Sequence, residues 1–441
     1  MGLKRNDWLI VLSLVILAVG LRMSSWMKLG YQFDWDQEND ATVVMKMLWD
    51  HKPTLIGPRV ASDNGFFVGP YHYYFLLPFF LATGGNPMSG AALGLLVVAL
   101  TTLSYYFVGL KLWNRKAGFL AALIYVFSDQ IIIWNAMYGP LLAVVGFFLI
   151  YRAMEGKIKW TWPAALCGLA ATIHLVPISI SVFLVTGIVL SKKRPTFREL
   201  LQMVLVYSIW FLPILIFDLR HDFLNLGKAL ELVAGNSGLV WDKMNFWRVW
   251  WRSFDVFGVH GAEDWRFVAE RILSVFLLIF GWWFVGRDMK LRIFTLIWLI
   301  TPTVLLYKYK GNLPEYYFSI ATAILPLILA GVVSRVNILV VALVTFLAIN
   351  YFTIRRVPLS VSLTNKLTIV DYLVNQNTDK YFNISYTLPY GDNNGFEYLF
   401  MWRKRLPDRS NRGHLYTVVN LPTADKGQVV VTSGPFGLIR R

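Results

Sequence analysis

Four carboxylates stand close together in the stretch Phe33 to Ala41, which reads Phe-Asp-Trp-Asp-Gln-Glu-Asn-Asp-Ala. They are Asp34, Asp36, Glu38 and Asp40, in a chain of which only 15% is charged. Like charges at this spacing repel one another and need a cation, a shared proton or a basic partner. A carboxylate can also take the proton of an attacking hydroxyl group. We therefore treat this stretch as the candidate centre of catalysis.

The acidic stretch runs into a segment with helical periodicity. A helix from Gln37 to Asp50 is predicted by the apolar residues Val43, Val44, Met47 and Leu48. Asp36 and Asp40 are four positions apart, so both are expected on one face near the start of this helix. They are the candidate catalytic residues. The alternative is a structural role, in which Asp34 or Asp36 caps the helix and its negative charge is stabilised by the helix dipole.

The triplet Asp34-Trp35-Asp36 also fits the Asp-x-Asp pattern with which glycosyltransferases that use nucleotide sugars hold a metal. If a divalent cation is used, its candidate ligands are Asp34, Asp36 and Glu38, and no cofactor is certain. Nucleotide sugars are cytoplasmic, whereas the orientation derived below puts this stretch on the other side of a membrane. The sequence has no phosphate-binding Gly-x-x-x-x-Gly-Lys-[Ser/Thr] loop, no His-Glu-x-x-His motif and no Cys pair, which argues against ATP hydrolysis and structural zinc.

The composition is that of a polytopic membrane protein. The chain has 441 residues, of which 56% are hydrophobic and 16% aromatic, and a mean hydropathy of +0.52. Its net charge of +16 comes mostly from short Lys and Arg clusters between apolar runs, so we expect no nucleic-acid partner. The single cysteine, Cys167, lies inside an apolar run and allows no intrachain disulfide.

Apolar runs long enough to cross a bilayer predict an all-α fold with about eleven transmembrane helices, given roughly 20 residues per crossing. They lie near residues 7 to 27, 88 to 111, 117 to 134, 138 to 153, 161 to 173, 175 to 191, 200 to 217, 267 to 286, 291 to 307, 316 to 334 and 336 to 354. The first run is read as a retained signal anchor, because no small-residue cleavage site follows it.

The short apolar stretch Gly69 to Thr83 decides the predicted orientation of the chain in the membrane. It is interrupted by Pro78 and rich in aromatic residues, and if it lies at the membrane interface, most Lys and Arg clusters fall on the side of Lys4 and Arg5. The positive-inside rule selects this arrangement. We therefore predict a cytoplasmic N-terminus and a transmembrane domain over residues 1 to 356, with juxtamembrane helices in a first outer loop (28 to 87) and a long Trp-rich outer loop (218 to 266).

The composition changes near the C-terminus. A helical period around Leu367 to Val374 is followed by strand-like runs at 381 to 388, 415 to 421 and 428 to 432, separated by Gly, Asn and Pro turns. We predict a small extracytoplasmic α/β domain over residues 357 to 441. It is near the lower size limit for independent folding, so we expect it to rest on the membrane part.

A second group of candidates lies on the same predicted side and is mostly basic. It contains Arg59, His174, Arg220 and His221, with His72 and Tyr316 as further substrate-binding candidates. Arg offers paired donors that suit a phosphate group, which favours a phosphate pocket. The alternatives are anchoring at lipid headgroups for Arg220 and His221, and a packing role for His174.

Asp129 is a possible second acid. It lies within the outer third of a predicted span, where an ionisable residue is a functional candidate by default. The alternative is that Ser128 or Asn135 merely satisfies its hydrogen bonds.

The order of several short motifs resembles the GT-C glycosyltransferases, and most closely the bacterial branch related to protein O-mannosyltransferases and aminoarabinose transferases. The resemblance covers about residues 1 to 335 and is carried by the stretches Asp36-Gln37-Glu38-Asn39-Asp40-Ala41, Leu55-Ile56-Gly57-Pro58, Gly69-Pro70-Tyr71-His72-Tyr73-Tyr74, Leu112-Trp113-Asn114-Arg115-Lys116 and Phe217-Asp218-Leu219-Arg220-His221. It implies an acid of the first outer loop at the centre of catalysis, a role carried onto Asp36 and then Asp40. The family often has another acid in the second outer loop, but Trp134 to Tyr138 has none.

The leading hypothesis is an inverting glycosyltransferase in a bacterial plasma membrane. Its donor would be a polyprenyl-phosphate sugar and its acceptor a lipid, a glycan or a protein. The competing hypothesis is a transporter or flippase for a lipid-linked glycan, for which charged or interrupted helices at mid-membrane and a two-fold repeat are expected. A third reading, with the tail as an assembly module on a membrane scaffold, has little support in the sequence.

Overall fold

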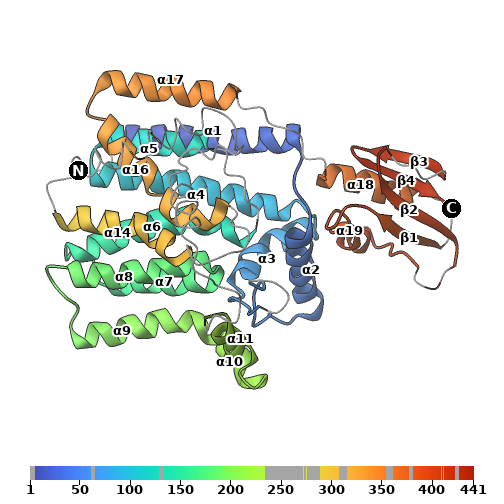
Figure 1. Ribbon diagram of the computed structural model, residues 1–441, viewed down its shortest axis with the longest axis horizontal. Helices are drawn as coiled ribbons and strands as arrows, with labels where there is room; N and C mark the ends of the chain where they lie inside the picture. Colours follow the sequence, from blue (N-terminus) through green and yellow to red (C-terminus); the bar gives the residue numbers. More distant parts are fainter. Residues whose placement is uncertain are drawn as a thin grey trace. The chain divides into compact units, whose positions relative to one another are not determined.

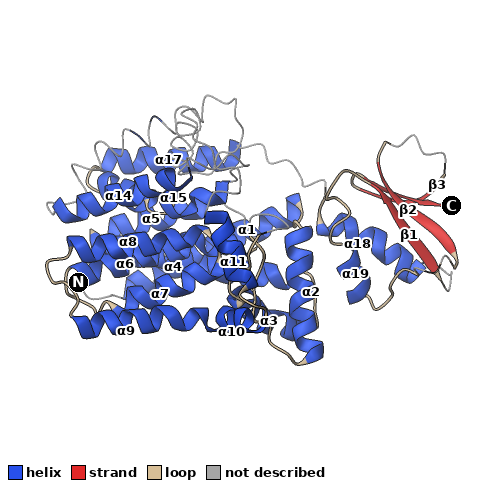
Figure 2. Ribbon diagram, turned by 60° about the horizontal axis from the view of Figure 1, so that its bottom comes forward, coloured by secondary structure: helices blue, strands red, loops and turns tan. Residues whose placement is uncertain are grey.

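The computed structural model of the chain is shown in Figures 1 and 2. It describes residues 5–60, 65–128, 134–233, 272, 275, 289–306, 315–353, 361–376, 381–408, 410, 412–422 and 427–441. The chain forms two compact units. The first unit comprises Met1–Gly20, Leu55–His72 and Leu95–Ile354, and the second comprises Leu21–Thr54, Tyr73–Gly94 and Arg355–Arg441.

The regular secondary structure in the described part of the first unit is helical, apart from a β-bridge between Arg59 and Phe67 (Figure 1). Three helices, α1 (Arg5–Leu29), α3 (Tyr71–Thr83) and α4 (Ser89–Leu112), contribute residues to both units. The other helices of the first unit are α5 (Arg115–Phe127), α6 (Gly139–Met154), α7 (Thr161–Ile173), α8 (Ser179–Leu190), α9 (Phe197–Ser208), α10 (Leu212–Arg220), α11 (Leu224–Val233), α14 (Met289–Leu306), α15 (Ser319–Thr322), α16 (Leu325–Val333) and α17 (Asn337–Thr353). Short 3₁₀ turns, η1 (Asn135–Tyr138), η2 (Val176–Ile178), η3 (Ile209–Phe211) and η4 (Glu315–Phe318), join some of them.

Six helical stretches in the described part are long and apolar enough to cross a membrane: Arg5–Lys28, Ser89–Leu112, Asn135–Met154, Phe197–Arg220, Met289–Leu306 and Tyr316–Val333. Three shorter apolar helices accompany them, Thr161–Ile173, Val176–Leu190 and Asn337–Ala348. All nine coincide with predicted spans, which identifies an integral membrane protein. Apart from residues 272 and 275, the predicted span near 267 to 286 lies outside the described residues, so the total of about eleven spans stays a prediction.

The stretch Phe197–Arg220 exposes most of its apolar surface. Phe197 is 76% exposed, Leu205 68% and Val204 63%. Water would disfavour so large an apolar surface, whereas lipid tails solvate it, and a helix satisfies its own backbone groups there. This exposure is what a helix at the lipid boundary requires.

Glycines set how closely the helices of the first unit approach one another. α7 packs on α9 and η3 at Gly168, where a Cβ atom would lie 2.4 Å from the Tyr207 carbonyl oxygen. α16 contacts α5, and a Cβ at Gly331 in α16 would lie 2.7 Å from the Trp113 ring. Small residues at helix contacts are typical of membrane bundles, because packing rather than hydrophobicity drives association in lipid.

The aromatic side chain of Trp298 in α14 lies at the centre of the helical packing. It is fully buried and stacks on Phe183 of α8, with ring centroids 3.9 Å apart. Its ring also contacts Phe147 of α6 edge-on. The indole nitrogen donates to the Ile320 carbonyl oxygen at 2.8 Å, so this bulky residue is buried without an unpaired polar atom.

A buried ion pair joins the beginnings of α1 and α5. Asp7 is 1% exposed and accepts hydrogen bonds from Arg115 Nε at 2.7 Å and from the Tyr106 hydroxyl at 3.0 Å. A buried carboxylate requires such partners, since an unpaired charge there would be strongly unfavourable. The contact therefore fixes α5 against the first turns of α1.

The second unit contains α2 (Trp35–Asp50), most of α3 (Tyr71–Thr83), and the C-terminal elements α18 (Leu363–Asp371), the π-helical η5 (Tyr372–Gln376), β1 (Phe382–Thr387), α19 (Phe396–Trp402), β2 (His414–Asn420), β3 (Gln428–Ser433) and β4 (Phe436–Arg440). The four strands form one sheet in the order β1-β2-β4-β3, in which β1 and β2 are parallel and the other pairs antiparallel. Figure 2 shows these strands in red, with α18 and α19 beside them. The predicted α/β tail is confirmed, and β4 is a strand that the sequence pattern did not predict.

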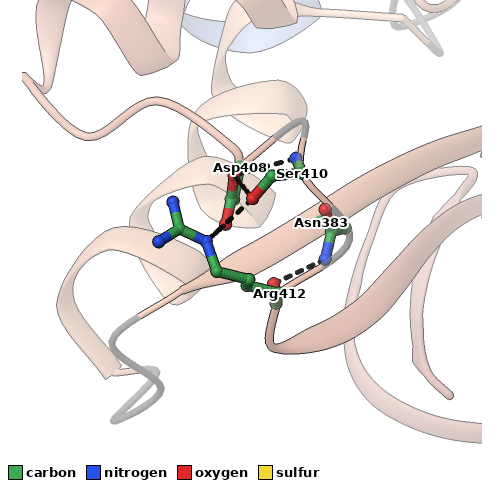
Figure 3. A network of polar contacts seen from close by, with 4 residues as sticks. All are labelled: Asn383, Asp408, Ser410 and Arg412. Carbon is green, nitrogen blue, oxygen red and sulfur yellow. Dashed lines mark hydrogen bonds and ion pairs between the residues drawn. The ribbon is translucent and has the colours of Figure 1, made fainter.

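A polar loop precedes β2 (Figure 3). Asp408 accepts hydrogen bonds from the Ser410 hydroxyl at 2.7 Å and from Arg412 Nε at 3.0 Å, and Asn383 of β1 donates to the Arg412 carbonyl oxygen at 2.7 Å. The bonds from Ser410, and then those from Arg412, lower the pKa of Asp408. The network holds the start of β2 next to β1, which is its parallel neighbour.

The tail is joined to the acidic stretch by two charged side chains. Lys366 of α18 is fully buried, and its ammonium group donates to the carbonyl oxygens of Phe33, at 2.8 Å, and of Asn394. Glu38 of α2 accepts hydrogen bonds from the amides of Gly395, at 2.7 Å, and Tyr398, at 3.0 Å, at the beginning of α19. Glu38 thus supplies the N-terminal cap of α19 from a distant part of the sequence.

Burial lowers the pKa of Lys366 to about 8, although the charges of Asp34, Glu38 and Asp392 act in the opposite direction. The ammonium form is therefore still the major one at pH 7. The contact also requires a glycine at position 395, because the φ of Gly395 is +93° and a Cβ atom there would lie 2.7 Å from the Phe33 carbonyl oxygen. The contact between the acidic stretch and the tail depends on both residues.

We expect Lys366→Met to loosen this contact. The substitution leaves two buried carbonyl oxygens without their donor, which costs about 2 kcal/mol by the usual penalty for an unsatisfied buried group. Hydrogen exchange of the α19 amides in the full-length protein should therefore accelerate markedly. Lys46→Met is the matched control, because Lys46 lies on the exposed face of α2. Equal protection of α19 in both variants would show that Lys366 does not hold the contact.

Candidate active site

Asp34 is the N-cap of α2, as the structural alternative predicted. Its amide donates to Gln37 Oε1 at 3.1 Å, and its carboxylate accepts a bond from Gln32 Nε2. These bonds satisfy backbone and side-chain groups at the beginning of the helix. Asp34 is therefore partly committed to local structure.

Asp36 and Asp40 differ in their exposure although they are one turn apart. Asp40 is 6% exposed and belongs to the buried face of α2, together with Gln37, Ala41, Val44 and Met47. Asp36 keeps part of its surface exposed and lines a cavity. Burial, and then the charges of Asp40 and Asp34, raise the pKa of Tyr31 far above its usual value, so this buried phenol stays protonated beside the acids. Of the two catalytic candidates, Asp36 is the one that a substrate in the cavity can reach.

The cavity has a volume of about 430 Å³ and lies within the second unit. Its walls come from the acidic stretch and from the tail, with the lining residues Gln32, Asp34, Trp35, Asp36, Val361, Tyr390, Gly391, Asp392 and Asn394. Trp35 is 51% exposed and Tyr390 fully exposed, so both rings are accessible. The cavity thus combines carboxylates, amides and aromatic rings.

Only Asp34 and Asp36 of these lining residues were among the predicted site residues. The largest group missed is the set of loop residues Tyr390, Gly391, Asp392 and Asn394. They lie more than 350 positions after Asp36, and helical or strand periodicity carries no signal for such a contact. The available signal was the turn sequence Tyr-Gly-Asp-Asn-Asn-Gly, a polar loop between predicted elements.

The predicted metal ligands do not form a shared site. Both carboxylate oxygens of Glu38 accept backbone amides of the tail, and Asp34 caps its helix. Among the residues that the structure describes, no group of three or more His, Cys, Asp or Glu side chains is arranged to hold a metal ion. A divalent cation held by Asp34, Asp36 and Glu38 therefore does not fit, and we assign no chemical step to one.

Three of the predicted substrate-binding residues gather in the first unit. His72 is buried, and its Nδ1 lies 3.2 Å from the Tyr138 hydroxyl. His174, at the end of α7, meets the ring of Tyr316 edge-on with centroids 5.7 Å apart. Burial, and then the charge of His72, lower the pKa of His174 to about 4. The structure therefore brings His72, His174 and Tyr316 into one neighbourhood, with His174 neutral at pH 7.

His174 is nevertheless able to donate a hydrogen bond. Its Nδ1 accepts the amide hydrogen of Val176 at 3.2 Å. In a neutral imidazole that accepts at Nδ1, the remaining proton is on Nε2. His174 thus offers a neutral hydrogen-bond donor and not a positive charge, which corrects the charge that the sequence suggested.

Arg59 lies over the ring of Phe67, 4.7 Å from its centroid. Asn225 holds the Phe67 backbone at both its amide (2.6 Å) and its carbonyl group (3.1 Å). Asp218 in turn accepts the amides of Asn225, at 2.8 Å, and Leu226, at 3.2 Å. Asp218 and Asn225 were not predicted as functional residues, and they position the strand-like segment that carries Arg59.

Arg220 and His221 lie at the end of α10 with exposed side chains. The His221 ring stacks on Phe217, and its Nδ1 is 2.8 Å from the Phe217 carbonyl oxygen. Both the phosphate and the headgroup interpretations fit an exposed position at a helix end.

Asp129, with the Trp-rich part of the predicted outer loop, lies outside the described residues. The predicted meeting of the acids with these cations across one cavity stays a prediction.

No protein-family model matches the chain, and no curated protein matches it. Among solved structures, it is similar to the oligosaccharyltransferase AglB of Archaeoglobus fulgidus in complex with an inhibitory peptide and a dolichol-phosphate, with a TM-score of 0.54 and 11% identity over 92% of this chain and 64% of that one. A structure of the Archaeoglobus oligosaccharyltransferase with Zn and sulfate gives a TM-score of 0.50 and 12% identity, over 90% and 62% of the two chains. The chain thus spans less than two thirds of these archaeal proteins.

A third similar structure is ArnT from Cupriavidus metallidurans bound to undecaprenyl phosphate, with a TM-score of 0.46 and 11% identity over 99% of this chain and 97% of that one. The fold assignment rests on the archaeal alignments, which cover 90% and 92% of this chain. Those alignments confirm the fold that the resemblance in the sequence implied. The chain shares its fold with the archaeal oligosaccharyltransferase AglB.

Proposed function

We propose that this protein is an inverting glycosyltransferase that transfers a sugar from a polyprenyl-phosphate carrier to a lipid, glycan or protein acceptor. The observation that carries the proposal is the position of Asp36, which lines a cavity of about 430 Å³ in a chain with the GT-C fold. Carboxylates with access to a cavity are suited to deprotonate a bound hydroxyl group. The dolichol-phosphate in the similar AglB structure supports a lipid-phosphate donor.

In this proposal Asp36 acts as the catalytic base. A carboxylate oxygen takes the acceptor proton as the acceptor oxygen forms a bond to the anomeric carbon. The bond between that carbon and the phosphate oxygen breaks on the opposite face, so the configuration inverts and polyprenyl phosphate leaves as an anion. Asp40, buried one turn further along α2, would orient or polarise the base rather than contact the acceptor.

The departing phosphate needs positive charge or hydrogen-bond donors, because negative charge develops on it in the transition state. We assign this task to Arg59, Arg220 and His221, with His174 as a neutral donor. His72 and Tyr316 belong to the same substrate-binding group through their contacts with Tyr138 and His174.

We place the site on the extracytoplasmic face, with the N-terminus in the cytoplasm. The positive-inside rule supports this orientation. The tail and the acidic stretch would share that compartment, because Lys366 and Glu38 bind the two segments together. The chemistry would then use a lipid-carried donor, since nucleotide sugars are cytoplasmic.

The donor class is tested by incubating the purified protein in detergent with a panel of polyprenyl-phosphate sugars and a mixture of acceptors. We expect free polyprenyl phosphate to accumulate with at least one donor, because transfer breaks the bond between the sugar and the phosphate. Extraction and mass spectrometry measure the product. If no donor releases polyprenyl phosphate, the transporter or flippase hypothesis is favoured instead.

We expect Asp36→Asn to reduce transfer by at least about 100-fold, the lower end of the usual contribution of a general base. The amide keeps the shape of the side chain but cannot take a proton. Asp50→Asn is the matched control, because Asp50 ends the same helix with an exposed side chain. Rates of polyprenyl phosphate release are compared after size-exclusion chromatography confirms that both variants are folded. Wild-type activity in the Asp36 variant would exclude this residue as the base.

Arg220→Ala separates the phosphate interpretation from headgroup anchoring. If Arg220 binds the donor phosphate, the KM for the donor should rise about tenfold, as expected for the loss of one charge-assisted hydrogen bond, while the KM for the acceptor stays the same. Arg198→Ala, an exposed arginine near the start of α9, is the control. An unchanged donor KM in the Arg220 variant would favour the anchoring role.

A further inference from the structure

The proposed reaction uses the wall of the cavity that contains Asp36, and it gives no role to the wall formed by the tail. That wall is the loop from Tyr390 to Asn394, between β1 and α19. The loop is held in place by backbone bonds from Asp392 to Pro389 and from Asn394 to Gly391, both 3.1 Å long. The bond from Lys366 to the Asn394 carbonyl oxygen fixes it against the acidic stretch. The loop is therefore held in place at the cavity that Asp36 also lines.

The charge of the cavity limits what it can bind. Asp34, Asp36 and Asp392 contribute three carboxylates, and none of the nine lining residues is Lys or Arg. The nearby Lys366 is fully buried, and its donors are directed at backbone carbonyl groups. A phosphate or carboxylate group in the cavity would be repelled, because like charges at short range are unfavourable. The cavity thus suits an uncharged or cationic group.

The chemical types in the cavity match a sugar. The carboxylates accept hydrogen bonds from hydroxyl groups, while the amides of Gln32 and Asn394 donate as well as accept. The accessible rings of Trp35 and Tyr390 offer flat apolar surfaces for the carbon-bound hydrogens of a sugar ring. The volume of about 430 Å³ lies within the usual range for small-molecule sites.

We propose that Asp392 and Tyr390 bind the acceptor, and that the acceptor presents an uncharged or cationic sugar to Asp36. This inference rests on the proposed function, in which Asp36 deprotonates the acceptor hydroxyl. Asp392 accepts hydrogen bonds from acceptor hydroxyl or ammonium groups, and Tyr390 covers one face of the ring. The donor phosphate is bound outside this cavity, so loss of Asp392 or Tyr390 affects the acceptor alone.

The first test is binding without any donor. Saturation-transfer NMR on the full-length protein in detergent is used with neutral trisaccharides of glucose, mannose and N-acetylglucosamine, with a glucosamine trisaccharide and with trigalacturonate. At least one neutral or cationic probe should bind, and Asp392→Asn and Tyr390→Ala should each weaken it about tenfold, the effect of losing one good contact. Tighter binding of trigalacturonate, equal binding by the variants, or no binding by any probe would overturn the proposal.

Asp408→Asn is the matched control, because it removes the same charge from the same tail at a loop outside the cavity (Figure 3). It should bind the probes like the wild-type protein. If it weakens binding as much as Asp392→Asn does, the effect is a general one of charge and the assignment of Asp392 is wrong.

The second test uses transfer kinetics, and it separates this inference from the proposed function. With an active donor, Asp392→Asn should raise the KM for the acceptor about tenfold and leave the KM for the donor unchanged. If the donor KM changes instead, Asp392 does not bind the acceptor. If no donor is cleaved while the sugar probes still bind in an Asp392-dependent way, the cavity is a glycan-binding site and the glycosyltransferase proposal fails.

Discussion

The contact between Lys366 and the acidic stretch is the constraint on which the candidate site depends. A fully buried ammonium group is unfavourable unless its donors are used, and here they bind the carbonyl oxygens of Phe33 and Asn394. Glu38 makes the complementary contact with the amides of α19. Because the two charged groups bind backbone atoms, they fix where the loop at Tyr390 to Asn394 lies with respect to Asp36. Without them the cavity has only one wall.

The four acids of this stretch have different roles in this arrangement. Glu38 caps α19, and Asp40 is enclosed by the buried face of its helix. Asp34 and Asp36 both line the cavity, but Asp34 also caps α2. The density of acids that drew attention to this stretch thus has mixed causes, and Asp36 is the cavity-lining acid of the stretch that does not cap a helix.

The sequence by itself determined the local features of this protein. Spans such as α1 and α4 follow from hydropathy, since lipid demands that each segment satisfy its own backbone groups. The helix after Asp34 and the strands β1 to β3 follow from periodicity and turn residues, which act between near neighbours. Asp36 was also proposed as a catalytic candidate from the sequence, because the spacing of the acids and the motif order are local properties. β4 escaped prediction because it directly follows the Gly434-Pro435 turn and has only five residues.

Only the tertiary structure decided which of these residues contact one another or line the same cavity. Glu38 is more than 300 positions from Gly395 and Tyr398, and Lys366 is as far from Phe33. Hydrogen bonds between such distant positions leave no trace in periodicity. For the same reason Asp392 and Tyr390 were not predicted to line the cavity with Asp36. The neutral state of His174 also depends on burial and on the nearness of His72, which are properties of the packed chain. Long-range contacts and local dielectric environment, rather than residue type, set the chemistry of this site.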